Sequence, residues 1–227
     1  MDAAKIYDKM AGVYRNISNG RWRYLNAVDD IIVLSQPRAP KRYLDVGCGD
    51  GHRTKILTNR IEPHGTDLID PSMRMVEKAS AVFNHVELCS IENYVAPYCY
   101  NLITALWNVL GHVEDREKSL SNIRSLLDPR DGLFIFDVNN RYNLGYGFWN
   151  VAKNMLRDLF RLKSGWFSFN FKGEEFPTYL YSPREIKGLL KKAGLEVVKS
   201  YGVDYETGEI HKSLFRGQMV FVTRRAG

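Results

Sequence analysis

The chain has 227 residues, of which 44% are apolar and 26% charged, and its formal net charge is +6 at pH 7. This composition indicates an ordinary globular domain with a sizeable core, and no stretch approaches the roughly 18 unbroken apolar residues of a transmembrane helix. The N-terminus has early acidic residues and no apolar signal core, so no export signal is expected and a cytoplasmic protein is predicted.

Two helices are expected first, because apolar residues recur at helical spacing around residues 6–14 and again around 24–32. The segment PRAP, residues 37–40, interrupts the chain after them. Strands are then expected at 42–47, 64–69, 85–89, 101–107, 133–138, 195–203 and 217–224, with helices at 51–60, from 71 onward, at 114–127 and from 182 onward. Asp70 is expected to cap the helix that begins at Pro71. This alternation predicts a doubly wound, mostly parallel α/β sheet, which binds ligands at the carboxyl ends of its strands.

The three cysteines, Cys48, Cys89 and Cys99, are odd in number and lack the spacing of metal ligands. They predict free thiols in a reducing compartment, and no metal site is expected. The moderate positive charge is compatible with an acidic partner such as RNA or a membrane surface, but the bases are scattered along the chain.

Three glycines follow the first predicted strand in the segment GCGDG, which runs from Gly47 to Gly51. A side chain at Gly47 or Gly49 would hold off a nucleotide or nucleoside that lies over such a turn. A glycine-rich turn alone is weak evidence for a ligand, since tight strand-to-helix turns also use glycine. His52 occupies the place of the third glycine of a dinucleotide fold, which disfavours an NAD oxidoreductase.

A carboxylate at the end of the second predicted strand strengthens the case for a ligand. Asp67 follows Asp45 by 22 residues, and a carboxylate there can accept hydrogen bonds from both hydroxyls of a ribose. Glycines and carboxylate together therefore predict a nucleoside site.

These segments resemble the class I S-adenosylmethionine-dependent methyltransferases. The resemblance rests on YLDVGCGDG, GTDLIDPSMRMVEKA, LCSIENY, YNLITALWNVLGHV and SLLDPRDGLFIFDV, and it is close over 42–138 and looser over 179–224. It implies a Rossmann-like methyltransferase fold with a seven-stranded sheet, an N-terminal helical cap and a lid inserted after the fifth strand. The first motif is specific to the superfamily and not to a substrate.

The resemblance also implies S-adenosylmethionine as the cofactor and a set of residues that contact it. Asp67 would take the ribose, while Arg21, or its rival Arg23, would meet the carboxylate. By analogy the cofactor-binding residues are Tyr14, Arg21, Asp45, Gly47, Cys48, Gly49, Asp67, Leu68, Ser90, Ile91, Trp107 and Asn108.

Methyl transfer is an in-line displacement at an activated sulfonium, so the protein mainly aligns the reactants and excludes water. A general base is needed only where the nucleophile arrives protonated. His112, after the fourth predicted strand, is the candidate catalytic base, and a structural role is the alternative.

Residues 139–181 form an insertion rich in aromatic residues. Within 149–163 an apolar helical face lies beside four bases, and the members of the face are Trp149, Ala152, Met155, Leu156, Leu159 and Phe160, with the bases Lys153, Arg157, Arg161 and Lys163. The segment predicts an amphipathic lid packed on the sheet edge, a cover for a bulky substrate, or a surface that makes peripheral contact with lipid.

A single domain is therefore predicted over 1–227, with a helical cap (1–36), a cofactor-binding half (37–138), a substrate lid (139–181) and a C-terminal helix and strands (182–227). The predicted activity is methyl transfer from S-adenosylmethionine to a nitrogen or oxygen of a small molecule. A tRNA methyltransferase is one alternative, to which the net charge and a faint likeness of YDKMAGVY to wobble-base enzymes point, although no RNA-binding module is present. A non-catalytic cofactor-binding module is the other. The substrate and the oligomeric state are left open.

Overall fold

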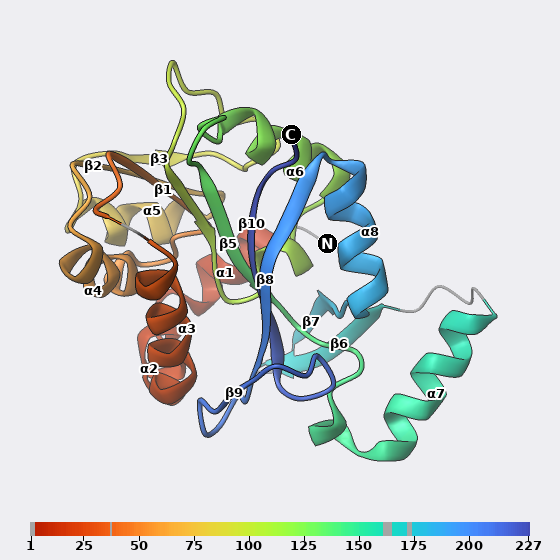
Figure 1. Ribbon diagram of the computed structural model, residues 1–227. Coiled ribbons are helices and arrows are strands. Elements are labelled where there is room, and N and C mark those ends of the chain that lie inside the picture. The colour runs from red at the N-terminus through yellow and green to blue at the C-terminus, as the bar shows by residue number, and fades with distance from the viewer. Residues whose placement is uncertain (1–2, 37, 161–164, 172–173) are drawn as a thin grey trace.

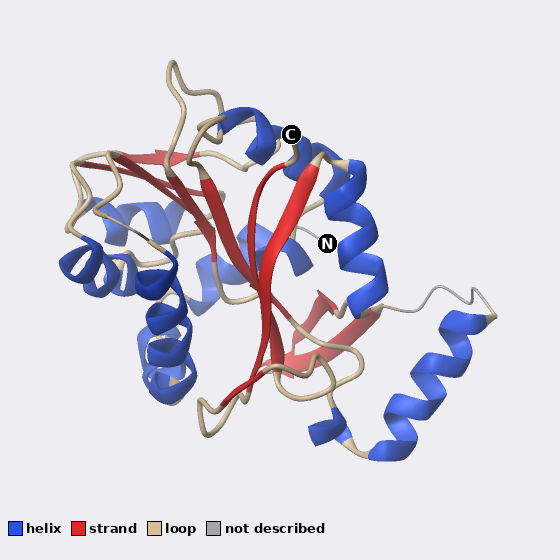
Figure 2. Ribbon diagram, in the orientation of Figure 1, coloured by secondary structure: helices blue, strands red, loops and turns tan. Residues whose placement is uncertain are grey.

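An eight-stranded sheet runs through the molecule with helices on both faces (Figures 1 and 2). The computed structural model describes residues 3–36, 38–160, 165–171 and 174–227. The strands are β1 (Arg42–Val46), β2 (Gly65–Asp70), β3 (Val86–Leu88), β4 (Leu102–Ala105), β5 (Leu133–Val138), β8 (Leu195–Val203), β9 (Ile210–His211) and β10 (Gln218–Arg225).

The strand order is β3-β2-β1-β4-β5-β10-β8-β9. The five strands from β3 to β5 are parallel, whereas β10 runs antiparallel to both β5 and β8. The order reverses between β1 and β4, which makes the carboxyl ends of these two strands the expected place for a ligand. The predicted doubly wound α/β fold is confirmed, but the count of seven strands is wrong, because the two-residue strand β9 pairs with the end of β8.

The described helices are α1 (Ala3–Met10), α2 (Tyr14–Asn19), α3 (Trp22–Ser35), α4 (His52–Ile61), α5 (Met73–Ser80), α6 (Arg116–Leu126), α7 (Phe148–Leu159) and α8 (Pro183–Lys192), with short 3₁₀ turns at Val109–Gly111 and Leu144–Tyr146. Helices α3 and α4 bury Ile32 and Leu57 in one core cluster. Helices α6 and α8 bury Ile123 and Leu190 in another. Each such side chain contributes about 1.5–3 kcal/mol when fully buried, and these two layers hold the sheet whose edge carries the site.

Two element boundaries differ from the expectations. The first predicted helix is broken after Met10 and resumes as α2. Helix α5 begins at Met73 and is capped by Ser72, whose Oγ accepts a hydrogen bond from the backbone N–H of Met75. The expectation that Asp70 caps a helix from Pro71 is therefore wrong, and Asp70 is the last residue of β2.

The insertion 139–181 contains helix α7 and a separate antiparallel hairpin of β6 (Trp166–Phe171) and β7 (Glu174–Tyr179). Figure 1 shows α7 standing out from the body of the molecule. The expectation that its apolar face packs on the sheet edge is wrong, since Trp149 is 82% exposed and Leu159 is 75% exposed. Arg161 and Lys163, which the sequence placed on this helix, lie outside the described residues.

Within the described residues, no helix combines the length and apolarity needed to cross a bilayer. The three cysteines are free thiols, as predicted.

Candidate functional site

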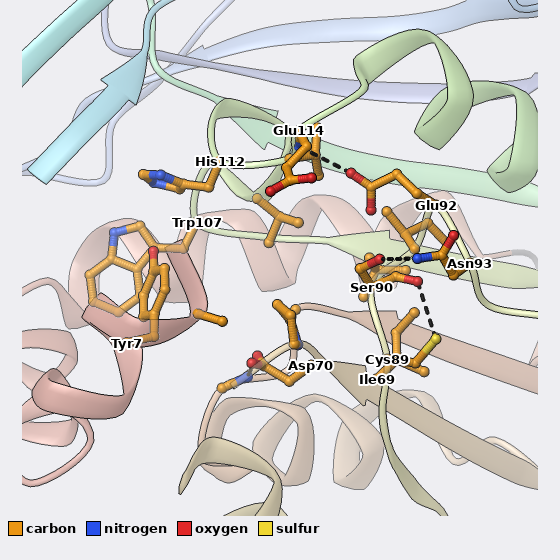
Figure 3. Close-up of a pocket in the computed structure, with 18 of the residues that line it drawn as sticks. Tyr7, Ile69, Asp70, Cys89, Ser90, Glu92, Asn93, Trp107, His112 and Glu114 are labelled. Carbon is orange, nitrogen blue, oxygen red and sulfur yellow. Dashed lines mark hydrogen bonds between the residues drawn. The ribbon is translucent and has the colours of Figure 1, made fainter. Parts of the chain in front are cut away.

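A cavity of about 460 Å³ opens at the carboxyl ends of β1, β2 and β4 (Figure 3). Three segments that follow these strands meet there: the glycine turn, the start of the β2–α5 connection, and the loop after β4. Helix α1 and the residue at the start of α2 close the cavity from outside the sheet, and the segment after β3 forms its remaining wall. The predicted cofactor residues that line it are Tyr14, Gly47, Gly49, Ser90, Ile91 and Trp107, together with the candidate base His112.

Neighbouring side chains account for the glycines of the turn. Gly47 has φ +69°, and a Cβ there would lie 2.6 Å from Cγ2 of Val109. Gly49 has φ +56°, and its Cβ would lie 3.0 Å from Cε1 of Tyr14. Both positions combine a left-handed backbone with close packing, so only glycine fits without strain. Gly47 and Gly49 also line the cavity, so the turn presents its backbone there.

Asp70 presents its carboxylate at the end of β2, beside this turn. Its Oδ2 accepts a hydrogen bond from the N–H of Gly49 at 2.9 Å, and its Oδ1 accepts one from the N–H of Ser72 at 2.9 Å. Burial raises the pKa of Asp70 to about 6. Each carboxylate oxygen has more than one acceptor position, so the group can still accept hydrogen bonds from a ligand in the cavity.

Asp67, the predicted ribose ligand, lies outside the cavity lining. It stands three residues before the end of β2. Its Oδ2 accepts hydrogen bonds from Tyr98 Oη at 2.9 Å and Tyr100 Oη at 2.8 Å. The sequence placed Asp67 at the end of the second strand, and the structure corrects this position, because the strand continues to Asp70.

Three further predicted residues lie behind the turn rather than in the cavity lining. Asp45 is buried and accepts hydrogen bonds from the hydroxyls of Thr54 and Thr104. Cys48 and Leu68 pack together in a small core cluster. These side chains support the shape of the turn from beneath.

The loop after β4 contains two consecutive residues of positive φ, Trp107 and Asn108. Trp107 lines the cavity and donates its indole N–H to Tyr205 Oη at 2.7 Å. Asn108 is buried, donates its side-chain amide to Thr178 Oγ1 at 2.7 Å and receives the N–H of Asn139 at 2.9 Å. Its side chain is thus occupied in joining this loop to β5 and the hairpin.

The N-terminal cap contributes an aromatic wall and no cavity-lining arginine. The ring of Tyr14 lies 5.5 Å from that of Trp107. Arg21 instead lies 4.5 Å over the ring of Tyr205 and 3.8 Å from a carboxylate oxygen of Glu206. The rival Arg23 lies over the ring of Trp22.

Tyr7 was missed by the sequence reasoning, although it follows Ile6 in the predicted first helix. Its ring lies 5.8 Å from that of His112 and 5.5 Å from that of Phe176. His112 lines the same end of the cavity, and burial lowers its pKa to about 4, an effect that a hydrogen bond with the backbone of Pro177 opposes. Tyr7, Trp107 and His112 form an aromatic end of the cavity (Figure 3).

The opposite end is polar and mostly acidic. Ser90, Glu92 and Asn93 lie there in Figure 3. Glu92 Oε1 accepts the N–H of Glu114 at 3.0 Å, and Lys118 donates to Asn93 Oδ1 at 3.0 Å. The lining holds four carboxylates and one amine, namely Asp70, Glu92, Glu114, Asp115 and Lys118. Such a lining favours a cationic ligand over an anionic one.

Residues 20–200 match the family described as a methyltransferase domain, which is most of the chain. The chain belongs to this family. The methyltransferase is 24% identical over 224 residues to the uncharacterized protein MJ1252 of Methanocaldococcus jannaschii, a match that covers 95% of this chain and 85% of the relative. It is 25% identical over 173 residues to a ubiquinone biosynthesis O-methyltransferase of Neisseria meningitidis, with 73% and 68% covered.

Solved structures share the fold at low identity. An S-adenosylmethionine-dependent methyltransferase of Clostridium acetobutylicum has a TM-score of 0.69 at 18% identity, with 98% of this chain and all of that chain covered. The 1,6-didemethyltoxoflavin-N1-methyltransferase of Burkholderia thailandensis, solved with S-adenosylhomocysteine, has a TM-score of 0.68 at 15% identity, with 99% and 87% covered. The predicted fold, family and enzyme class are confirmed. S-adenosylmethionine was the predicted cofactor, and the Clostridium acetobutylicum enzyme is named as dependent on it.

In the part of the chain that the structure describes, no group of three or more histidine, cysteine, aspartate or glutamate side chains is placed to hold a metal ion.

Proposed function

We propose that this methyltransferase transfers a methyl group from S-adenosylmethionine to a nitrogen or oxygen atom of a small molecule. One observation carries the proposal: the glycine turn, Asp70 and the loop after β4 meet around one cavity with an aromatic end. The cavity's fit to the cofactor rests on three features of this chain: backbone without Cβ at Gly47 and Gly49, a carboxylate with free acceptor capacity, and an acidic lining suited to a sulfonium cation.

In this proposal Asp70, rather than Asp67, accepts hydrogen bonds from the ribose hydroxyls. Ser90 and Ile91 lie against the adenine, and the turn at Gly47 and Gly49 lies against the methionine portion. Tyr14 covers the cofactor above Gly49, which its ring already contacts closely. Arg21 already contacts Tyr205 and Glu206, so we do not propose that it binds the carboxylate of the cofactor's methionine portion.

The acceptor lies at the aromatic end, between Tyr7, Trp107 and His112. When bound, the cofactor supplies a methyl group on a positively charged sulfur, which needs alignment with the nucleophile more than it needs an acid or base. The aromatic rings hold a small acceptor in place and exclude water from the transfer. A His112 ring with a pKa of about 4 is neutral near pH 7; it can accept a hydrogen bond from the acceptor but is a weak base.

The acidic groups of the cavity oppose a nucleic acid as substrate. Glu92, Glu114 and Asp115 lie at its polar end with one lysine, and phosphates near them would meet repulsion. Two of the similar proteins are named for methyl transfer to oxygen or nitrogen, a ubiquinone biosynthesis O-methyltransferase and a 1,6-didemethyltoxoflavin-N1-methyltransferase.

The test is a transfer assay with methyl-labelled S-adenosylmethionine over pooled amines, pooled phenols and total tRNA. We expect label in a small-molecule pool with wild type and less label with Asp70→Ala when the cofactor is below saturation. Label in tRNA alone would support the tRNA alternative. Cofactor binding without transfer to any pool, a full cell extract included, would support the non-catalytic module.

A further inference from the structure

Helix α7 presents a row of large apolar side chains to solvent. Trp149 is 82% exposed, Leu159 75% and Phe160 66%. With spacings of three and four residues these side chains share one broad face of the helix, whose exposed members are Phe148, Trp149, Met155, Leu156, Leu159 and Phe160. We call this set the apolar face of α7. None of its members lines the cavity, so the helix does not cover the site in the way the sequence predicted.

The other face of α7 fixes the helix to the body. Val151 is the buried residue of the helix. Asn154 donates its side-chain amide to the carbonyl oxygen of Arg141 at 3.2 Å, and Asp158 pairs with the Arg141 guanidinium at 3.0 Å. Arg141 also pairs with Glu185 of α8 at 2.8 Å. These contacts recur every three or four residues, so they set the rotation of the helix and direct its apolar face outward.

Positive charge accompanies the apolar face. Lys153 and Arg157 are exposed and lie beside it on the helix. Residues 148–163 contain four bases and one acid. The acid is Asp158, which the Arg141 ion pair occupies. The outward surface of α7 is therefore apolar and basic, with aromatic rings at both ends of the helix.

We propose that α7 binds the surface of an anionic lipid bilayer, with its apolar face inserted at the boundary of headgroups and acyl chains. A helix with aromatic and leucine side chains on one face and bases beside them has the composition of an interfacial helix. The exposed bases complement anionic headgroups. A second copy of this chain is a poorer occupant, because a symmetric pairing of two α7 faces would bring like charges together.

The experiment is sedimentation of the full chain with vesicles of phosphatidylcholine, with and without about a third phosphatidylglycerol, at low and high salt. We expect binding to the anionic vesicles at low salt and release as salt screens the bases. Leu156→Ser combined with Leu159→Ser should lower the partition coefficient by roughly tenfold or more, since two exposed side chains lose their burial in lipid. Lys153→Glu combined with Arg157→Glu should lower it by about tenfold or more.

Matched controls distinguish an effect of α7 from an effect of exposed apolar area or net charge in general. Leu34→Ser removes an exposed leucine of α3, which is 81% exposed, and Lys55→Glu with Lys78→Glu changes net charge as much as the α7 pair. Both controls should bind vesicles like wild type. All variants should keep the wild-type melting temperature, because the changed side chains face solvent.

Three results would overturn the proposal. One is a wild-type chain that binds no vesicles, or binds neutral ones equally. Another is equal loss of binding in the controls. The third is unfolding of the leucine variant, or a wild-type dimer by light scattering that this variant alone abolishes, since the apolar face would then pack on protein. None of these results depends on methyl transfer, so the proposed function stands or fails separately.

Discussion

Asp70 is the residue on which cofactor recognition depends in this account. Asp70→Ala removes the acceptor for the ribose hydroxyls, and hydrogen bonds to a charged group contribute about 1.5–3 kcal/mol. We expect affinity for S-adenosylhomocysteine to fall by about tenfold or more, measured by isothermal titration calorimetry. Asp67→Ala is the matched control on the same strand, and it should change affinity less than threefold. If Asp67→Ala weakened binding more than Asp70→Ala did, Asp67 would be the residue that binds the ribose.

The raised pKa of Asp70 gives cofactor binding a pH dependence. The group has a pKa of about 6, so above that value it is ionised and accepts hydrogen bonds fully, whereas below it the carboxyl is protonated. Affinity for S-adenosylhomocysteine should therefore be highest above pH 6 and fall as pH drops from about 6 toward 5. In calorimetric titrations across this range, Asp70→Asn should show a flatter profile. A wild-type affinity that is constant from pH 7 to 5 contradicts the assignment.

His112 tests whether the reaction uses a general base. With a pKa of about 4, the ring is neutral but a poor acceptor of a proton near pH 7, where an effective base has a pKa close to the working pH. We expect His112→Asn to lower kcat by less than about tenfold, with cofactor affinity nearly unchanged. A loss of about 10²-fold or more, together with a displaced acid limb of the pH–rate profile, would make His112 the base.

At the scale of elements, Asp8 fastens the N-terminal cap beside the cofactor cavity. Its Oδ1 accepts hydrogen bonds from Ser72 Oγ at 2.6 Å and from the backbone N–H of Arg74 at 3.0 Å, at the N-terminus of α5. The Ser72 hydrogen bond lowers the pKa of Asp8. A carboxylate at this end of a helix is stabilising, so the contact ties α1, which carries Tyr7, to the segment after Asp70.

Asp8→Ala should therefore loosen the cap. Loss of a capping side chain costs about 1 kcal/mol, which lowers the melting temperature of a chain of this size by about 2–4 °C. Stopped-flow measurement should show faster release of S-adenosylhomocysteine, because α1 lines the cavity. Glu77→Ala, at an exposed acid on the same helix α5, should change neither quantity. Unaltered release from Asp8→Ala would mean that α1 does not hold the cofactor.

The elements also show how far the sequence could predict the structure. The apolar runs predicted seven strands of the eight-stranded sheet, because buried strands and amphipathic helices have distinct periodicities, whereas β9 and the hairpin of β6 and β7 were not predicted. The predicted strand 64–69 differs from β2 by one residue at each end, but Asp67 was predicted to be the carboxylate at the strand end, whereas Asp70 is the last residue of β2 and Ser72 caps the helix that follows. Helix α7 was located correctly, but its periodicity could not say whether the apolar face packs on protein or faces outward. The orientation of the helix is set by the ion pairs of Arg141 with Asp158 and Glu185, and these pairs join residues that are distant in sequence.

At the scale of the whole molecule, the strand order brings the cofactor segments together. The reversal between β1 and β4 places the glycine turn, the end of β2 and the loop after β4 on one edge of the sheet (Figure 1). Helix α7 lies outside this edge, and the insertion that carries it contributes no described residue to the cavity lining, although Phe176 of its hairpin packs against Tyr7. We therefore expect cofactor binding and membrane binding to use separate surfaces of the chain.

Hydrogen–deuterium exchange with and without S-adenosylhomocysteine tests this arrangement most directly, because it reports the local stability of each segment. We expect slower exchange with the ligand in four stretches, 4–14, 47–52, 69–76 and 89–93, and in the loop 107–113, with no change in 148–160. A contradictory result would be unchanged exchange at the glycine turn and at 69–76, or protection concentrated in 148–160.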